Sequence, residues 1–275
     1  MFRKTTGSIL CPSCRRITNA DAATCFYCGR RRPGMWGFAP AARLLGGYVG
    51  VTPLVISTCV VLYVVSVLLD PLAALRPRGP FDLLAPSSRA LYRLGMTGAE
   101  PWALGRWWTL ITAMYLHGGL LHILFNVLWI RQLGPAVEEL YGSGRLAVIF
   151  TVSGVAGFVM SNPLDPSPTI GASGAIFGLL GAMVAYGRQR GGVFGRLVLR
   201  QYGQWALVLF VFGFLMPGVN NFAHAGGFLG GLASGLVLSN LERRPEGWLD
   251  RALAAATFAV TALAFLLALW HGFLS

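Results

Sequence analysis

Long apolar stretches alternate with short polar ones from Val51 to the end of the chain, whereas the first 34 residues are polar and basic. Only the first and last apolar stretches approach the roughly 20 residues that a lone helix needs to cross a bilayer. The middle ones are short, are interrupted by Gly and contain His, Asn or Ser, which a helix bundle tolerates when neighbours or water satisfy the polar groups. The pattern predicts seven membrane-spanning helices, at about 51–69, 117–133, 146–162, 170–187, 203–217, 222–239 and 252–274.

Composition supports this assignment. Of the 275 residues, 55% are hydrophobic and only 12% are charged, and the mean hydropathy is +0.62. Soluble domains carry about 25% charged residues, so an ordinary soluble enzyme is excluded. We therefore expect an all-α polytopic membrane protein with three regions: an N-terminal domain at 1–34, a Gly/Pro/Ala-rich linker at 35–50 and a membrane domain at 51–275.

Positive charge indicates how the chain crosses the membrane. The net charge is +12, and 17 of the 22 Lys and Arg residues lie in segments on one side of the predicted spans. The positive-inside rule places that side, with the N-terminus, in the cytoplasm and the C-terminus outside. The polar start of the chain predicts no cleavable signal peptide. Because the bilayer explains the excess of Arg beside the spans, we expect no nucleic-acid partner.

Four cysteines form two C-x2-C pairs within one window of the N-terminal domain. Such pairs direct four thiolates to one tetrahedral ion, which predicts a zinc-ribbon-like domain holding one structural zinc. The alternative is two disulfides, which the reducing cytoplasm disfavours. The predicted zinc ligands are Cys11, Cys14, Cys25 and Cys28.

Polar side chains enter three of the predicted spans from the same end. His122 and Asn126, Ser173 and His224 all fall roughly 5–13 Å below the outer surface at 1.5 Å per residue. Taken singly, each could be a helix-packing or interhelical hydrogen-bonding residue. Four polar intrusions at one depth are costly, however, and they favour shared chemistry. Because no Asp or Glu lies at that depth, a Ser–His dyad with side-chain oxyanion donors fits better than a triad, and such a site needs no catalytic cofactor.

Small residues surround this group. A stripe of glycines in the fourth span is spaced to meet a similar stripe in the sixth, which would let the two backbones approach closely. Phe177 follows Ser173 by four residues, on the same face, where it could stack on the ring of His224. Glycine packing without chemistry is the alternative. The predicted stripes are Gly171, Gly174, Gly178 and Gly181, and Gly227, Gly231 and Gly235.

At these residues the chain resembles the rhomboid intramembrane serine proteases. The matching motifs are HGGLLHILFN at 117–126, GASG at 171–174 and AHAGGFLGG at 223–231. The resemblance implies a six-helix bundle, here with one extra C-terminal transmembrane helix. It implies Ser173 as nucleophile and His224 as general base. It further implies an oxyanion hole of His122, Asn126 and the Ser173 backbone N–H, with Gly171 in its motif, His117 in a supporting role and Phe177 packed on the catalytic His.

The segment at 70–106 is the longest predicted loop. It is rich in Pro and Arg, and its end carries Trp102, Trp107 and Trp108, which suit a membrane-interface belt. We expect a lid-like loop that lies on the surface. The rhomboid family often has Trp-Arg before its second span, but here Thr109 stands where the Arg is expected, which puts the usual polar anchoring of this loop in doubt.

Two functions of different classes follow from these features. The first is a protease that cleaves transmembrane protein substrates in or near their spans, embedded in the lipid bilayer. The second is a non-catalytic rhomboid-like protein that binds membrane clients. A transporter is disfavoured because no acidic residue lies at the midplane to couple ions. One Lys against many Arg, Ala and Gly points to a GC-rich bacterial genome, and hence to the bacterial plasma membrane.

Overall fold

The structure is a computed structural model that describes residues 3–12, 16–27, 29–39, 50–76, 79, 82–238 and 246–274. The chain forms two compact units, residues 1–54 and residues 55–275. Each unit has its own packed residues and is described separately. Most of the predicted linker, residues 40–49, lies outside the described residues.

The first unit is built on a small β-hairpin. Strands β1 (Ser8–Leu10) and β2 (Ile17–Asn19) pair antiparallel, with Leu10 opposite Ile17. A single 3-10 turn, η1 (Met35–Gly37), follows. The buried apolar residues of this unit form a small core of Ile9, Ala20 and Ala39, which is typical of a short domain that needs further support.

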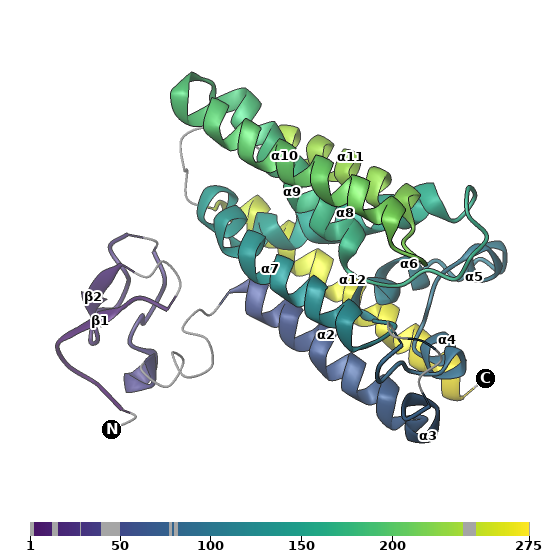
Figure 1. The fold of residues 1–275 in the computed structure, drawn as a ribbon. Helices are drawn as coiled ribbons and strands as arrows, with labels where there is room; N and C mark the ends of the chain where they lie inside the picture. The colour runs from purple at the N-terminus through teal and green to yellow at the C-terminus, as the bar shows by residue number, and fades with distance from the viewer. Residues whose placement is uncertain are drawn as a thin grey trace. The chain divides into compact units, whose positions relative to one another are not determined.

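The second unit is helical (Figure 1). Its described part contains seven helices of 18 residues or more, each of which overlaps one of the predicted spans. They are α2 (Val51–Leu68), α7 (Leu120–Tyr141), α8 (Ser143–Ser161), α9 (Ser173–Arg190), α10 (Gly192–Leu215), α11 (Asn221–Leu238) and α12 (Trp248–Phe273).

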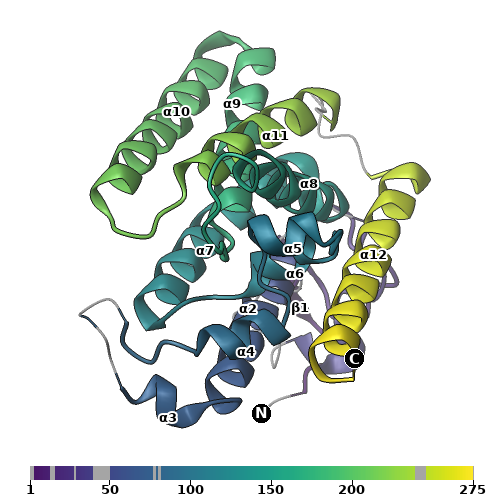
Figure 2. The ribbon, with the colours of Figure 1, turned by 90° about the vertical axis from the view of Figure 1, so that its right-hand side faces the viewer.

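Five of these helices are long and apolar enough to cross a membrane: α2, α7, α8, α10 and α12. Helices α9 and α11 are long enough but do not belong to this set. Both are rich in Gly and carry polar residues. Helix α9 is buried along most of its length, whereas α11 packs one face on α8 and α9 and leaves Leu229, Leu236 and Val237 exposed. Helix α9 contacts α7, α8, α10 and α11, so it is the central helix (Figure 2).

Two predicted helix limits are wrong. Helix α10 begins at Gly192, eleven residues before the predicted start at 203, because its first turns carry the exposed Arg196 and Arg200, which an apolar pattern does not include. Helix α7 continues to Tyr141 although Pro135 lies inside it. Proline removes one backbone donor, but this helix extends beyond it.

The segment between α2 and α7 is more buried than predicted. It folds into α3 (Pro71–Ala74), α4 (Ser88–Arg93), α5 (Ala99–Ala103), α6 (Thr109–Thr112) and the 3-10 turn η2 (Ala113–Tyr115). Leu91 and Leu94 pack with Leu116 in an apolar cluster. Trp108 is 9% exposed, so it is a packing residue, whereas Trp102 and Trp107 are exposed. The prediction of a loop that only lies on the surface is therefore wrong.

Candidate active site

The site lies where the first turns of α7, α9 and α11 meet. Helices α9 and α11 approach at backbone distance, because a Cβ atom on Gly227 or Gly231 would overlap the backbone of Gly174 or Gly178. A Cβ on Gly181 would likewise meet the backbone of Phe228. The predicted glycine contact between these two helices is confirmed, and it brings the start of α9 beside the start of α11.

Ser173 is the first residue of α9 and is half-buried. The turn before it is fixed by Gly171, whose φ of +118° is in a region that favours glycine, and whose N–H donates to the carbonyl oxygen of Ala113 at 2.9 Å. The first N–H groups of a helix have no partner within the helix. The hydroxyl of Ser173 therefore lies beside backbone donors that can bind a developing negative charge.

His224 lies in the first turn of α11 and is 7% exposed. Its ring stacks on Phe177, with the centroids 4.3 Å apart and the planes 20° from parallel, which confirms the predicted contact. Since Ser173 precedes Phe177 by one helical turn, the two residues share the face of α9 that the His224 ring of α11 covers. Asn221 contacts the edge of the ring: its Oδ1 lies 3.2 Å from Nδ1 of His224.

His122 faces the turn that leads to Ser173. Its Nδ1 accepts a hydrogen bond from the N–H of Gly118 at 3.2 Å, so Nε2 carries the proton in the neutral ring. A Cβ atom on Gly171 would lie 2.6 Å from Nε2, so only glycine leaves room for that ring. The Nε2–H group is thus a donor that lies next to Gly171, two residues before Ser173.

Asn126 lies one turn beyond His122 and is 4% exposed. Its Nδ2 donates to the carbonyl oxygen of His122 at 2.8 Å, which uses one of its two amide hydrogens. Within the described part of the chain, no protein group bonds its buried Oδ1. The second amide hydrogen remains available as a donor.

His117 is completely buried beneath this group. Its Nδ1 lies 3.2 Å from the carbonyl oxygen of Tyr115, and its ring meets the His122 ring edge-on with centroids 5.1 Å apart. His117 therefore contacts the site through the ring of His122, and its supporting role stays a prediction.

A buried polar network, which the sequence analysis missed, anchors the segments around the site. Thr97 lies at its centre: Oγ1 of Thr97 bonds Thr109 Oγ1 at 3.1 Å and accepts from Asn162 Nδ2 at 3.0 Å. The backbone of Thr97 accepts from Thr169, whose hydroxyl in turn accepts from Asn220 Nδ2 at 3.1 Å. The network thus joins the segment before α7 to both loops that precede α9 and α11.

The same network includes Thr109, the residue that stands where an Arg was expected. The residue is 3% exposed and also donates to the carbonyl oxygen of Arg106 at 2.8 Å, while Nη1 of Arg106 donates to the Tyr92 hydroxyl at 2.8 Å. The segment is therefore anchored by polar contacts despite the Thr. For the other residues of the polar network, the sequence offered one signal. The pair Asn220–Asn221 lies directly before a predicted span, a position where Asn often caps a helix.

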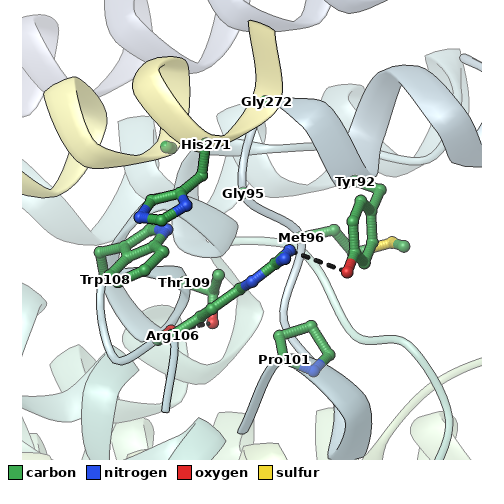
Figure 3. Close-up of a pocket in the computed structure, with 10 residues that line it drawn as sticks. Tyr92, Gly95, Met96, Pro101, Arg106, Trp108, Thr109, His271 and Gly272 are labelled. Atoms are coloured by element: carbon green, nitrogen blue, oxygen red, sulfur yellow. Dashed lines mark hydrogen bonds between the residues drawn. The ribbon is translucent and has the colours of Figure 1, made fainter. Parts of the chain in front are cut away.

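A small cavity of about 20 Å³ lies between the α4–α6 segment and the end of α12 (Figure 3). Arg106 crosses it toward Tyr92, and the His271 ring stacks on Trp108 with centroids 4.6 Å apart. The volume suits about one water molecule. The cavity therefore marks how α12 packs on this segment, and it has no room for a substrate.

The predicted zinc ligands lie apart in the sequence from this site. Cys11 and Cys25 are buried, whereas Cys14 and Cys28 lie outside the described residues. Among the residues that the structure describes, no group of three or more His, Cys, Asp or Glu side chains could hold a metal ion.

Comparisons with known proteins identify the family of this chain. The Rhomboid domain model matches residues 104–241. Rhomboid protease GluP of Bacillus subtilis (strain 168) is 36% identical over 168 residues, which cover 60% of this chain and 32% of GluP. RHOMBOID-like protein 4 of Arabidopsis thaliana is 34% identical over 172 residues, which cover 62% of this chain and 43% of that protein. YdcA of Bacillus subtilis (strain 168) is 35% identical over 176 residues, which cover 60% of this chain and 84% of YdcA.

The chain spans less than half the length of GluP and of RHOMBOID-like protein 4, but most of YdcA. The matched region, residues 104–241, contains Ser173, His224 and the groups around them. With its five membrane-length apolar helices, the chain is an integral membrane protein. It belongs to the rhomboid family.

Proposed function

We propose that the protein is an intramembrane serine protease that hydrolyses peptide bonds in or near the transmembrane segments of membrane proteins. The observation that carries this proposal is the environment of His224, which stacks on Phe177 one turn after Ser173 and has its Nδ1 bound by Asn221. This leaves Nε2 as the basic nitrogen of a Ser–His dyad. The relatives named as rhomboid proteases support the same reaction.

In the first half of the reaction, the Oγ of Ser173 attacks the substrate carbonyl carbon while His224 Nε2 takes the hydroxyl proton. The tetrahedral intermediate then breaks its C–N bond, and His224 returns the proton to the leaving amine. In the second half, a water molecule attacks the acyl-enzyme with His224 again as base, which releases the new carboxyl end and restores the serine.

Three donors would stabilise the oxyanion: the N–H of Ser173, Nε2–H of His122 and the second amide hydrogen of Asn126. Support comes from the contacts that occupy the other groups of these residues, since Gly118 N–H uses Nδ1 of His122 and the His122 carbonyl uses one hydrogen of Asn126. One such donor is worth about 10²–10³ in turnover.

All seven long helices would span the bilayer, with the N-terminus in the cytoplasm and the C-terminus outside. Helix α9 is the one that contacts with α7, α8, α10 and α11 shield from lipid, whereas α11 packs on α8 and α9 and would present its exposed Leu229, Leu236 and Val237 to lipid. The dyad then lies near the outer surface, at the start of helices that run inward. The bacterial plasma membrane remains our proposed location, on the composition of the chain.

The N-terminal unit would hold one structural zinc through Cys11, Cys14, Cys25 and Cys28. Two turns support this: the N–H of Cys11 donates to Arg16 O at 2.9 Å, and that of Cys25 to Arg30 O at 2.8 Å, so each C-x2-C begins a closed turn. A bound zinc would supply folding free energy to a small core. Purified protein is expected to contain about one zinc per chain, and a Cys11→Ser, Cys25→Ser variant none; unchanged metal content would contradict the site.

The decisive experiment measures cleavage of a single-pass model substrate in liposomes, with thermal unfolding followed in parallel. Ser173→Ala and His224→Ala should each remove nearly all turnover, and Asn126→Ala should lower it about 10²–10³-fold. A fluorophosphonate probe should label the wild type and not Ser173→Ala. Cleavage by a folded Ser173→Ala variant would overturn the protease assignment and leave the client-binding alternative.

A further inference from the structure

Asn221 makes a contact that the dyad itself does not explain. It is the first residue of α11, three residues before His224, and its Oδ1 lies 3.2 Å from Nδ1 of the imidazole. An amide oxygen can only accept a hydrogen bond, so this contact assigns the ring proton to Nδ1. We infer that Asn221 is a positioning residue that fixes the tautomer and the ring orientation of His224, an inference that rests on the proposed function.

The need for such a residue follows from the chemistry of imidazole. A neutral ring has two tautomers, and only the one protonated at Nδ1 presents a lone pair at Nε2 to take a proton from serine. The stack on Phe177 fixes the plane of the ring, with the planes 20° from parallel, but a stack does not distinguish the two nitrogens. The hydrogen bond with Asn221 distinguishes the two nitrogens and so fixes the rotation of the ring within its plane.

The other imidazole of the site, that of His122, does not take this role. Being another imidazole, with its own Nδ1 bound by Gly118 N–H, it is not an acceptor for the proton of His224. The amide of Asn221 therefore takes the place that a carboxylate holds in a Ser-His-Asp triad.

The amide of Asn221 is available because its neighbour caps the helix. Asn220 accepts from the N–H of Ala223 at 3.1 Å and donates to Thr169 at 3.1 Å, which are the contacts of a helix N-cap. Two adjacent asparagines thus have separate tasks. Asn220 caps the start of α11, and Asn221 accepts the hydrogen bond from the imidazole.

Helix α10 holds the Asn221 side chain in place. A Cβ atom on Gly213 would overlap Oδ1 of Asn221, and it would also lie 3.1 Å from Cγ1 of Val219. The amide oxygen therefore occupies space that only a glycine at 213 leaves open. This gives a second route to the same contact, through a residue that does not touch His224.

The first test compares Asn221→Leu, which removes the acceptor, with Asn221→Asp, which keeps an oxygen in the same position. We expect kcat to fall about tenfold in Asn221→Leu, the rate equivalent of one neutral hydrogen bond, with KM and the unfolding temperature unchanged. Asn221→Asp should restore most of kcat, because a carboxylate can only accept. A purely structural role would instead lower the unfolding temperature of Asn221→Leu, and Asn221→Asp would not restore kcat without also restoring that temperature.

The second test uses Gly213→Ala, which should displace the Asn221 oxygen and lower kcat by a similar factor. Its matched control is Gly203→Ala on the same helix, where a Cβ atom meets nothing within 4 Å, and which should cleave like the wild type. Combining Gly213→Ala with Asn221→Leu should add little to either alone, since both break one contact.

The outcomes separate this inference from the proposed function. If the wild type does not cleave the substrate, the protease proposal fails. If the wild type cleaves and Asn221→Leu has an unchanged kcat, only the positioning role fails. Should Asn221→Leu not fold, a wild-type kcat in Gly213→Ala would overturn the inference, and a tenfold lower kcat would support it.

Discussion

Helices α11 and α12 are attached to the bundle in different ways. Helix α11 meets α9 along its length through glycines, with backbone against backbone at Gly227 and Gly231. Helix α12 packs through one face, where Ala264 and Ala268 are buried, and it is also held by side-chain pairs near its two ends: Asp250 binds Arg145 at 2.7 Å, and His271 stacks on Trp108 at 4.6 Å. An added methyl group at the glycine contact would separate the helices that carry Ser173 and His224, whereas the outward face of α12 is exposed.

The difference indicates which helices set the chemistry. Backbone contacts cannot adjust to an added atom, so the geometry of Ser173 and His224 depends directly on the α9–α11 interface. Side-chain pairs can be lost one at a time. Helix α12 therefore packs on α8, α4 and α6 and stabilises the bundle without contributing a residue to the dyad.

The largest expected effect comes from breaking the glycine interface. In Gly231→Ala, the new methyl group would overlap Gly178 backbone atoms that cannot move aside, so we expect a loss of more than about 3 kcal/mol in the free energy of unfolding, together with loss of cleavage. Thermal unfolding in detergent and cleavage in liposomes measure the two effects.

The control for this change is Gly203→Ala in α10, which meets open space and should raise helix stability by up to about 1 kcal/mol. Equal stability of Gly231→Ala and Gly203→Ala would mean that α9 and α11 are not in backbone contact.

A smaller effect is expected at the start of α12. Arg145 is 4% exposed and binds both carboxylate oxygens of Asp250, at 2.7 and 2.8 Å, while its backbone N–H donates to Glu246. Arg145→Met should lower the free energy of unfolding by about 3 kcal/mol, because it leaves a carboxylate with no bidentate partner. The measurement is the unfolding temperature at constant lipid and salt.

The comparison for that change is Arg196→Met, at an exposed position on α10, which should alter stability by less than about 0.5 kcal/mol. The Arg145 variant should retain cleavage wherever it is folded. If cleavage fell as steeply as in Gly231→Ala without unfolding, α12 would have a direct part in the site.

The contrast between these helices also shows what the sequence could predict. The glycine stripes, Ser173, His224 and Phe177 are local patterns with helical spacing, so their faces followed from the sequence. The contact between the glycine stripes and the stack of Phe177 on His224 agree with the structure. Arg145 counted only as a positive charge at a helix end, because its partner Asp250 lies 105 residues away and no local pattern links them.

Other features were missed for similar reasons. The start of α10 carries Arg residues, which end an apolar pattern before the helix itself ends. The helices α4–α6 have four to six residues each, too few to show a period. Asn221 looked like part of a loop, since its acceptor role appears only when the imidazole three residues later is seen beside it.

The smallest expected effect is at the far end of α12. His271 stacks on Trp108 with the rings 13° from parallel, and an aromatic pair of this kind contributes about 1 kcal/mol beyond its buried area. His271→Ala should therefore lower the free energy of unfolding by about 1 kcal/mol. Trp108 precedes the Ala113 carbonyl that binds the Gly171 N–H, but other contacts hold that segment, including Thr112 Oγ1 to Gly95 O at 2.7 Å.

For this reason cleavage by His271→Ala should change by no more than about twofold, the rate equivalent of a few tenths of a kcal/mol. His271→Phe keeps a stacking ring and should recover the lost stability, whereas Leu266→Ala, at a position 64% exposed on the same helix, should cost less than about 0.5 kcal/mol. A stability loss at Leu266 equal to that at His271 would show that the stack on Trp108 contributes no more than an exposed side chain of the same helix, and would contradict the prediction.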